Sequence, residues 1–310
     1  MRRGTAATHD NGRVLIAHLS DLHLRHLDDV SWLDRQLTRI VARRPAHLAI
    51  TGDLLDRWDR ALLDRTLDTL QDHGLLDAEQ LTLLHGNHDL ASSGGHPRQN
   101  ADLIRLGLRF WDPPPLVRWR RRRFYASVAA RAQGIAQQPP WVKHLHCGLR
   151  IAVIDTVPIP WRPFMFERGA VTVHHAMGRV RPVEAEWLAT QRGELPLVVL
   201  AHHYPLDTPT FTWTPERQRS RAIDVLGKIV REVRVPMAIP ARDRERFWKG
   251  AHRAGVRLVL CGHVHRARLE WRDGIAVGLN GQSGADWAGR TVAFYELGDT
   301  TISRDSEQIG

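Results

Sequence analysis

The chain has 310 residues, 43% of them hydrophobic, which is the length and composition of a globular protein that can bury a sizeable core. Residues 1–12 lack the apolar region of a signal peptide, no apolar run is long enough to span a bilayer, and Cys147 and Cys261 are too few for a disulfide framework. We therefore expect a cytoplasmic protein without a transmembrane segment. The net charge of +10 is weak evidence for an anionic partner, because only three of the 44 basic residues are lysines, and GC-rich coding produces that skew whatever the protein binds.

Short apolar runs alternate with amphipathic helical patterns along the chain. The predicted strands are residues 14–19, 48–51, 81–84, 151–154, 197–201, 258–261, 275–279 and 291–297. The predicted helices are residues 32–42, 60–73, 182–191 and 243–254. This alternation is typical of an α/β sheet protein, and the last two strands favour a second, more antiparallel sheet. We interpret residues 1–310 as one domain, in which residues 112–148 and 205–240 are insertions over one face.

Polar side chains follow directly after five of the predicted strands. They are Asp21 and His23, Asp53, Asn87 with His88, His202 with His203, and His263 with His265. In open α/β sheets, ligand sites lie beyond the carboxyl ends of the strands, so these groups can converge although they are distant in sequence. Carboxylate, imidazole and amide donors together suit divalent Mn, Fe, Co, Ni or Zn. Seven donors that share one carboxylate would give four protein ligands to each of two ions, the arrangement that clamps a phosphoryl group.

Five short motifs, taken in order, carry a family resemblance. The blocks DLH, GDLLD, GNHD, AHHYP and GHVH resemble the signature blocks of the calcineurin-like metallophosphoesterases, from about Ile16 to Val277 and outside the two insertions. The resemblance implies a four-layer αββα sandwich, in which two mixed β-sheets are flanked by helices. It also implies a hydrolase that cleaves phosphodiester or phosphomonoester bonds by attack of a metal-bound hydroxide at a dinuclear centre.

The same resemblance implies a role for each motif residue. It places Asp21, His23 and His265 on the first metal, Asn87, His202 and His263 on the second, and Asp53 between them as a bridge. His88 is expected to be the catalytic histidine, beside the second metal and facing the substrate, with Asp89 orienting it. Asp56 falls on a further acidic position, for which we expect a supporting role.

Other histidines have ordinary explanations. His18 lies inside an apolar strand and His85 precedes Gly86, so we expect both to be packed side chains rather than ligands. Successive strand residues point to opposite faces, so only one of His202 and His203 is expected to bind, and the family pattern favours His202. The remaining candidates lack matching partners nearby and are interpreted as insertion residues: His144, His146, Cys147, His174 and His175.

Five arginines occupy the six residues Arg118–Arg123. The run is either a solvated face of an insertion or a contact for a polyanion or anionic lipid headgroups, helped by Trp119 and Phe124.

Residues 181–206 resemble the bacterial cyclic-nucleotide-phosphodiesterase-like members of the family, although Tyr204 stands where a proline commonly follows the histidine pair. Cyclic nucleotides are therefore one candidate substrate. The alternatives are a nuclease-like phosphodiesterase acting on DNA, a lipid-headgroup phosphoesterase and a metal-free scaffold. Against the nuclease, no capping domain is evident after Leu297; against the scaffold, every ligand position is filled. The sequence leaves the oligomeric state open.

Overall fold

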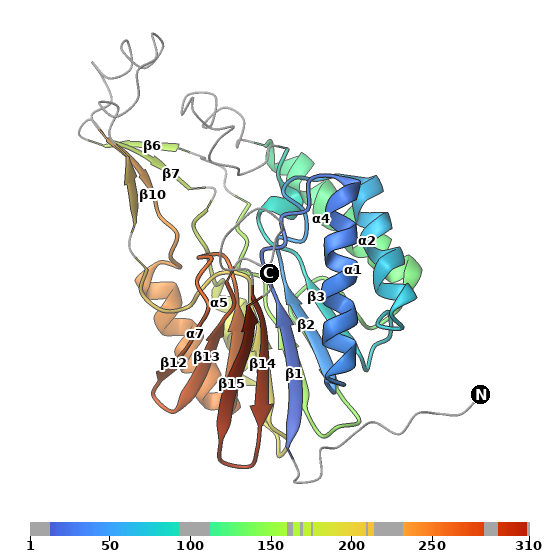
Figure 1. Cartoon of the computed structure of the whole chain (residues 1–310). Helices are drawn as coiled ribbons and strands as arrows, with labels where there is room; N and C mark the ends of the chain where they lie inside the picture. The colour runs from blue at the N-terminus through green and yellow to red at the C-terminus, as the bar shows by residue number, and fades with distance from the viewer. Residues whose placement is uncertain are drawn as a thin grey trace.

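The computed structural model describes residues 13–92, 112–159, 164–167, 170–174, 176–208, 210–213, 232–281 and 291–308. Two β-sheets stack face to face, and helices cover the outer face of each (Figure 1). Both sheets contain parallel and antiparallel pairs. The structure therefore confirms the predicted αββα sandwich of two mixed sheets.

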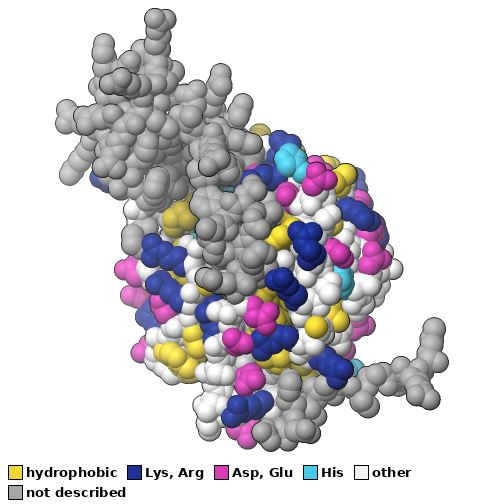
Figure 2. Space-filling view, viewed as in Figure 1, with side chains coloured by type: hydrophobic (Ala, Val, Ile, Leu, Met, Phe, Trp, Pro, Cys, Tyr) yellow, Lys and Arg dark blue, Asp and Glu magenta, His cyan; other side chains and the backbone are white. Residues whose placement is uncertain are grey.

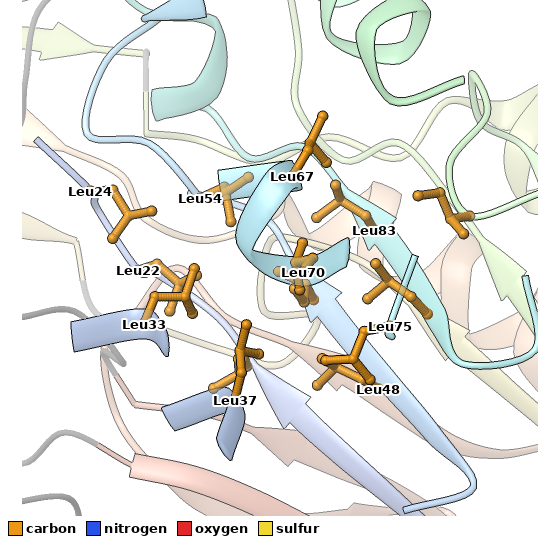
Figure 3. Packing of buried hydrophobic residues seen from close by; sticks show 14 of the residues in the cluster. Leu22, Leu24, Leu33, Leu37, Leu48, Leu54, Leu67, Leu70, Leu75 and Leu83 are labelled. Atoms are coloured by element: carbon orange, nitrogen blue, oxygen red, sulfur yellow. The ribbon is translucent and has the colours of Figure 1, made fainter. Parts of the chain in front are cut away.

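The first sheet has the strand order β15-β14-β1-β2-β3. Its strands are β1 (Val14–Leu19), β2 (His47–Thr51), β3 (Leu81–Leu84), β14 (Thr291–Leu297) and β15 (Ile302–Gln308). Three helices contribute to the core on its outer face: α1 (Leu27–Ala42), α2 (Arg60–Asp72) and α4 (Pro114–Arg131). Figure 3 shows leucines of α1 and α2, such as Leu33 and Leu70, packed against strand leucines such as Leu48.

The second sheet has the strand order β12-β13-β11-β8-β5-β4. Its strands are β4 (Trp141–His144), β5 (Arg150–Val153), β8 (Leu197–Leu200), β11 (Val256–Cys261), β12 (Arg268–Arg272) and β13 (Ile275–Leu279). Helices α5 (Pro182–Ala189) and α7 (Ala241–Ala254) cover its outer face. Gly255 follows the last residue of α7, and its φ of 69° is the left-handed conformation that glycine adopts most easily.

Both faces of the central strands are buried, which explains why they read as continuous apolar runs. In β1, Leu15 and Leu19 pack toward the helices, whereas Ile16 packs toward the second sheet. In β8, Val199 packs toward α5 and α7, whereas Leu200 packs toward the first sheet. This arrangement leaves polar side chains to the ends of the strands, where the chain turns.

A third, smaller sheet projects from the sandwich at the upper left of Figure 1. It has the order β6-β7-β10-β9, with β6 (Phe164–Glu167), β7 (Ala170–Val173), β9 (Phe211–Trp213) and β10 (Glu232–Val235). The predicted insertion at 205–240 contains β9 and β10. The β6–β7 hairpin that pairs with them lies in a segment for which no strand was predicted.

Two sequence-based expectations were wrong. Residues 112–148 are not an insertion over one face, because they supply α4 to the core of the first layer and β4 to the edge of the second sheet. The strands 275–279 and 291–297 do not form a separate antiparallel sheet. β13 pairs in parallel with β11, and β14 pairs with β1 in the other sheet. Across the described residues, no helix has the length and apolarity needed to cross a membrane.

Phe124 tests whether α4 is part of the core. Its side chain is fully buried among residues of α2 and the first sheet. Phe124→Ala should lower the free energy of unfolding by about 3–5 kcal/mol, because it removes a buried aromatic ring and leaves a cavity. Urea denaturation measures this change. Ala130→Ser, at an exposed position of the same helix, should change it by less than about 0.5 kcal/mol, and equal stability of the two variants would contradict the assignment of α4 to the core.

Candidate metal centre

The polar residues predicted from the strand ends come together where the two sheets meet. Asp21 and His23 follow β1, Asp53 follows β2 and Asn87 follows β3, all in the first sheet. His202 follows β8 and His263 and His265 follow β11, both in the second sheet. β1, β2 and β3 run parallel to one another, as do β8 and β11, so each sheet presents these residues at a single edge.

The backbone at this edge is strained. Seven non-glycine residues in the described chain have a positive φ, and five of them are candidate ligands: Asp21 (54°), His23 (46°), Asp53 (51°), His263 (72°) and His265 (52°). A left-handed conformation costs such residues about 1–3 kcal/mol each and persists where the surroundings over-determine it. Here Asp21 N donates to Gly52 O at 3.0 Å and His23 N donates to Asp53 O at 2.9 Å, which ties the two turns together.

The first cluster consists of Asp21, His23 and His265. Nε2 of His265 lies 3.3 Å from Oδ1 of Asp21 and 3.1 Å from Nε2 of His23. Nε2 of His23 lies 3.9 Å from the same Asp21 oxygen. Three donor atoms therefore face one point. Asp21 is held from behind, since His263 N donates to both of its carboxylate oxygens at 3.0 and 2.9 Å.

The second cluster consists of Asn87, His202 and His263. Nε2 of His202 lies 3.0 Å from Oδ1 of Asn87, and its Nδ1 donates to Thr51 O at 2.9 Å. Nε2 of His263 donates to Ala176 O at 2.7 Å, which leaves Nδ1 of His263 as the ring atom able to ligate. A backbone carbonyl that takes the second ring N–H is the usual way to fix the tautomer of a metal-binding histidine.

Asp53 stands between the two clusters. Its Oδ2 lies 3.3 Å from Nε2 of His202 and 3.8 Å from Nε2 of His23, while its Oδ1 accepts a hydrogen bond from His88 N at 2.8 Å. The backbone of Gly86 passes so close that a Cβ there would lie 2.1 Å from Oδ1 of Asp53, which requires glycine in this motif. One carboxylate oxygen of Asp53 therefore lies near a donor of each cluster.

The charges of the site fit divalent cations. Asp21 and Asp53 are at most 1% exposed, and across the described residues their ion pairs are with histidines, not with lysine or arginine. Buried carboxylates are costly unless a positive charge compensates them. Burial alone would lower the pKa of His202, but the carboxylates of Asp53 and Asp21 raise it to about 9. The donor set of carboxylate, imidazole and amide is the one that borderline divalent metals prefer.

A family model of the calcineurin-like phosphoesterases matches residues 14–267, which include every motif residue of both clusters. The chain belongs to the calcineurin-like phosphoesterase family. It is accordingly a hydrolase of phosphoric ester bonds, and its His and Asp clusters fit the dinuclear metal centre that the family typically binds.

Solved structures agree with this family at the level of the fold. A dimetal phosphatase from Danio rerio is 11% identical with a TM-score of 0.53, over 94% of this chain and 95% of that one. The protein TT1561 of Thermus thermophilus is also 11% identical, with a TM-score of 0.50 over 94% and 98% of the two chains. A comparison with curated protein sequences finds no significant match.

Asp89 does not orient His88 in this phosphoesterase, contrary to our expectation. Its Oδ1 accepts from Leu55 N at 2.8 Å and its Oδ2 accepts from Gly86 N at 2.7 Å, so it joins the two loops that carry Asp53 and Asn87. Burial, followed by the nearby charge of Asp53, raises the pKa of Asp89 to about 7. Nδ1 of His88 instead donates to the backbone carbonyl of Asp56 at 3.0 Å.

His88 also lies beside a different cluster from the one expected. Its ring packs edge-on against His23 with 4.6 Å between the centroids, and a ring nitrogen lies within 4.8 Å of ligand atoms of His23 and Asp53. The covalent link to Asn87 does not keep the side chain near the second cluster, because a 3₁₀ turn, η1 (His88–Leu90), begins at His88. The ring is therefore turned toward the first cluster.

Asp56 supports the first cluster, in the role expected for it. Its Oδ1 lies 3.5 Å from Nδ1 of His23 and its Oδ2 lies 3.3 Å from Nε of Arg25. The carboxylate thus contacts the ring nitrogen of His23 that points away from His265. Such a partner orients the imidazole and raises its basicity toward a metal.

Sequence reasoning missed a polar group behind the second cluster. Asp155 and Thr156 follow the predicted strand 151–154, so the strand-end signal was present but was not applied to them. Oγ1 of Thr156 lies 2.9 Å from the backbone N and 3.0 Å from Nδ1 of His203. Asp155 accepts from Val157 N at 2.9 Å and pairs with Arg121 at 2.6 Å. This loop fixes His203 beside His263.

His203 lies beside the second cluster, with a ring nitrogen within 4.8 Å of ligand atoms of His202 and His263, whereas His18 and His85 lie outside both clusters. Nε2 of His18 bonds with Oγ1 of Thr51 at 2.8 Å, and Nδ1 of His85 bonds with the Tyr125 hydroxyl at 2.6 Å. His144, His146, Cys147 and His174 belong to no metal-like group among the described residues, and His175 lies outside them.

Asp53→Asn tests the bridge. The amide can still accept the hydrogen bond from His88 N, but it carries no charge to share between the clusters. We expect a lower content of both ions by elemental analysis and almost no turnover, because one change affects both sets of donors. Asp64→Asn, at an outer carboxylate paired with Arg60, should keep both ions. Two tightly bound ions in Asp53→Asn would contradict the bridging role.

Proposed function

We propose that the protein hydrolyses phosphodiester or phosphomonoester bonds at a dinuclear centre, with cyclic nucleotides among the candidate substrates. Asp21, His23 and His265 would hold one divalent ion, Asn87, His202 and His263 the other, and Asp53 both. The observation that carries this proposal is the position of Asp53 Oδ2, which lies 3.3 Å from a donor of one cluster and 3.8 Å from a donor of the other.

When bound, two such ions supply positive charge for the phosphoryl oxygens and lower the pKa of a water near them. The protein's own residues position the substrate and donate hydrogen bonds or a proton to it. Because Nδ1 of His88 donates to Asp56 O, Nε2 is left for the substrate, and it carries a proton only in the imidazolium form. That form can donate to a phosphoryl oxygen or to the leaving group.

The substrate proposal draws on the stretch from α5 to the end of β8. Tyr204, which departs from the cyclic-nucleotide-phosphodiesterase pattern, is fully buried in the core beneath α7, and its hydroxyl bonds with Glu270. Its ring therefore belongs to the core of the second layer. All seven ligand positions are filled and converge, which disfavours a metal-free scaffold. Mn, Fe, Zn, Co or Ni as the metal and a cytoplasmic location belong to the same proposal.

A screen of the full chain reconstituted with each of these metals tests the proposed activity. Chromogenic phosphomonoesters and phosphodiesters come first, and cyclic nucleotides and phospholipid headgroup diesters follow. We expect turnover that needs added divalent metal and stops with a chelator. Turnover unaffected by chelation, or no turnover with any of the five metals, would contradict the proposal.

His88→Ala tests the histidine that faces the substrate. Both ions should be retained, while kcat should fall roughly 10²–10⁴-fold, the usual range for a positioned acid or base. Interactions that strengthen in the transition state appear in kcat rather than in KM. The loss should shrink for a nitrophenolate leaving group, which needs little protonation.

The control for His88→Ala is His146→Ala, at a ring that is 84% exposed and pairs with Glu79. This variant should keep full activity. A loss in His88→Ala that does not depend on the leaving group would point to donation to a phosphoryl oxygen instead. Full activity in His88→Ala would remove His88 from the mechanism.

A further inference from the structure

Helix α4 sorts the predicted arginine run onto different faces. Arg120 is 7% exposed, pairs with Asp112 at 2.7 Å and donates to Leu90 O at 2.8 Å. Arg121 pairs with Asp155 at 2.6 Å and donates to Val157 O at 2.8 Å. Neither of these two guanidinium groups is available for an external polyanion, because each anchors the helix to a loop beside the clusters.

The solvent face of α4 carries Trp119, Arg122 and Arg123. Their spacing of three and four residues places them side by side on the helix surface. Arg122 and Arg123 are exposed and form no ion pair with any described residue, and Trp119 is 47% exposed. The guanidinium carbon of Arg123 lies 5.6 Å from the centre of the Trp119 ring.

A second indole supports the first. Trp58 meets Trp119 edge-on, with 6.2 Å between the ring centroids and 70° between their planes, and Trp58 itself packs against the core. T-shaped packing of this kind is a favourable arrangement for two aromatic rings, so Trp58 helps to orient the Trp119 ring. Trp119 is therefore a half-exposed aromatic side chain that Trp58 supports, with Arg123 beside its ring and Arg122 nearby, and neither arginine forms an ion pair with a described residue.

This surface shares its supports with the candidate catalytic histidine. Trp58 follows Asp56, whose carbonyl accepts from His88, and Trp58 N donates to Ala91 O at 2.8 Å at the end of η1. Arg120, next to Trp119, donates to Leu90 O of the same turn. The short turn that begins with His88 is thus held between Trp58 and the helix that carries Trp119.

We propose that Trp119, supported by Trp58 and flanked by Arg122 and Arg123, is a stacking platform for a nucleobase of the phosphodiester that the metal centre receives. The proposal rests on the proposed function. Every base has a π-face that stacks on an indole, and the adjoining phosphates attract guanidinium groups. The base could belong to a mononucleotide or to a single strand, and the experiment below separates these two sources.

An anionic lipid surface fits the same residues less well. Membrane contact through an amphipathic helix needs an apolar face that enters the bilayer boundary. Among the described residues of α4, η1 and the 52–59 loop, Trp119 is the only exposed large hydrophobic side chain. The overall charge is no guide here, since Figure 2 shows Lys and Arg mixed with Asp and Glu on the visible face.

Binding of matched strands to the full chain tests the platform. One probe is a single-stranded oligonucleotide, and the other has the same phosphodiester backbone but abasic sites; electrophoresis after each measurement checks that both are still intact. Wild type should bind the strand with bases more tightly. Trp119→Ala should weaken that binding roughly 5- to 100-fold and remove the preference, since base stacking is lost. Trp119→Phe should restore part of it and Trp119→Leu should not.

The arginines should behave differently from the indole. Arg122→Gln with Arg123→Gln should weaken both probes alike and flatten the salt dependence, because phosphate contacts release counterions. The matched control is Lys249→Gln with Arg253→Gln. These two cations line a groove of about 220 Å³ between α5 and α7, on the opposite outer layer, and their loss should change nothing.

Further measurements distinguish a mononucleotide from a single strand, and a nucleic acid from an anionic lipid surface. If an added cyclic mononucleotide removes the preference of wild type for the strand with bases over the abasic strand, the platform accepts single nucleotides. If only an added strand with bases removes that preference, the platform accepts a polymer. Equal binding of the two strands by wild type would overturn the proposal. So would a protein that binds phosphatidylserine vesicles, equally well as wild type and as Trp119→Leu, but binds no strand. Turnover of a small chromogenic diester by wild type tests the proposed function separately.

Discussion

Asp21 and Asp53 carry negative charge into the seam between the two sheets. Taking a carboxylate out of water costs several kcal/mol unless an opposite charge meets it, and here only histidines among the described residues do so. Burial alone would lower the pKa of His202, but the nearby carboxylates of Asp53 and Asp21 raise it to about 9. The site lacks enough positive charge to balance its two buried carboxylates, and divalent cations would supply that charge. Folding and metal binding are therefore expected to be coupled.

The delivery of those carboxylates depends on strained turns. Left-handed backbone at Asp21, His23 and Asp53 bends the chain sharply after each strand, so that the side chains point along the seam instead of continuing the sheet. The cost is met by the sheets themselves, which fix both ends of every turn, and by backbone bonds such as Asp21 N to Gly52 O. Asp89 completes the arrangement by accepting from two loops at once. Rigid strands thus hold donors in positions that a free loop would not keep.

Helix α4 connects the core, the site and the surface. Its buried face packs Phe124 against the first sheet, its arginines at 120 and 121 reach loops beside the clusters, and its outer face presents Trp119. Helix α4, which the sequence suggested was part of a basic insertion, therefore contributes to the core, to the loops beside the clusters and to the surface. Helical periodicity distributes these contributions, because residues three or four apart share a face and their immediate neighbours do not.

The apolar runs of the sequence predicted an α/β protein with metal donors at its strand ends, because strands buried on both faces read as unbroken apolar runs and the donors follow those runs directly. The four-layer sandwich and the division of the donors into two clusters came from the resemblance of the five motifs to a known family. The sequence could not reveal α4, whose buried face contains Arg120, nor the β6–β7 hairpin. Tertiary structure alone decided which groups support the donors. Asp56 rather than Asp89 contacts His88, and Thr156 fixes His203, through contacts between turns far apart in the chain. Local sequence specifies where a strand ends; the direction of a side chain beyond that end depends on the turn it enters and on the partners that other strands bring to it.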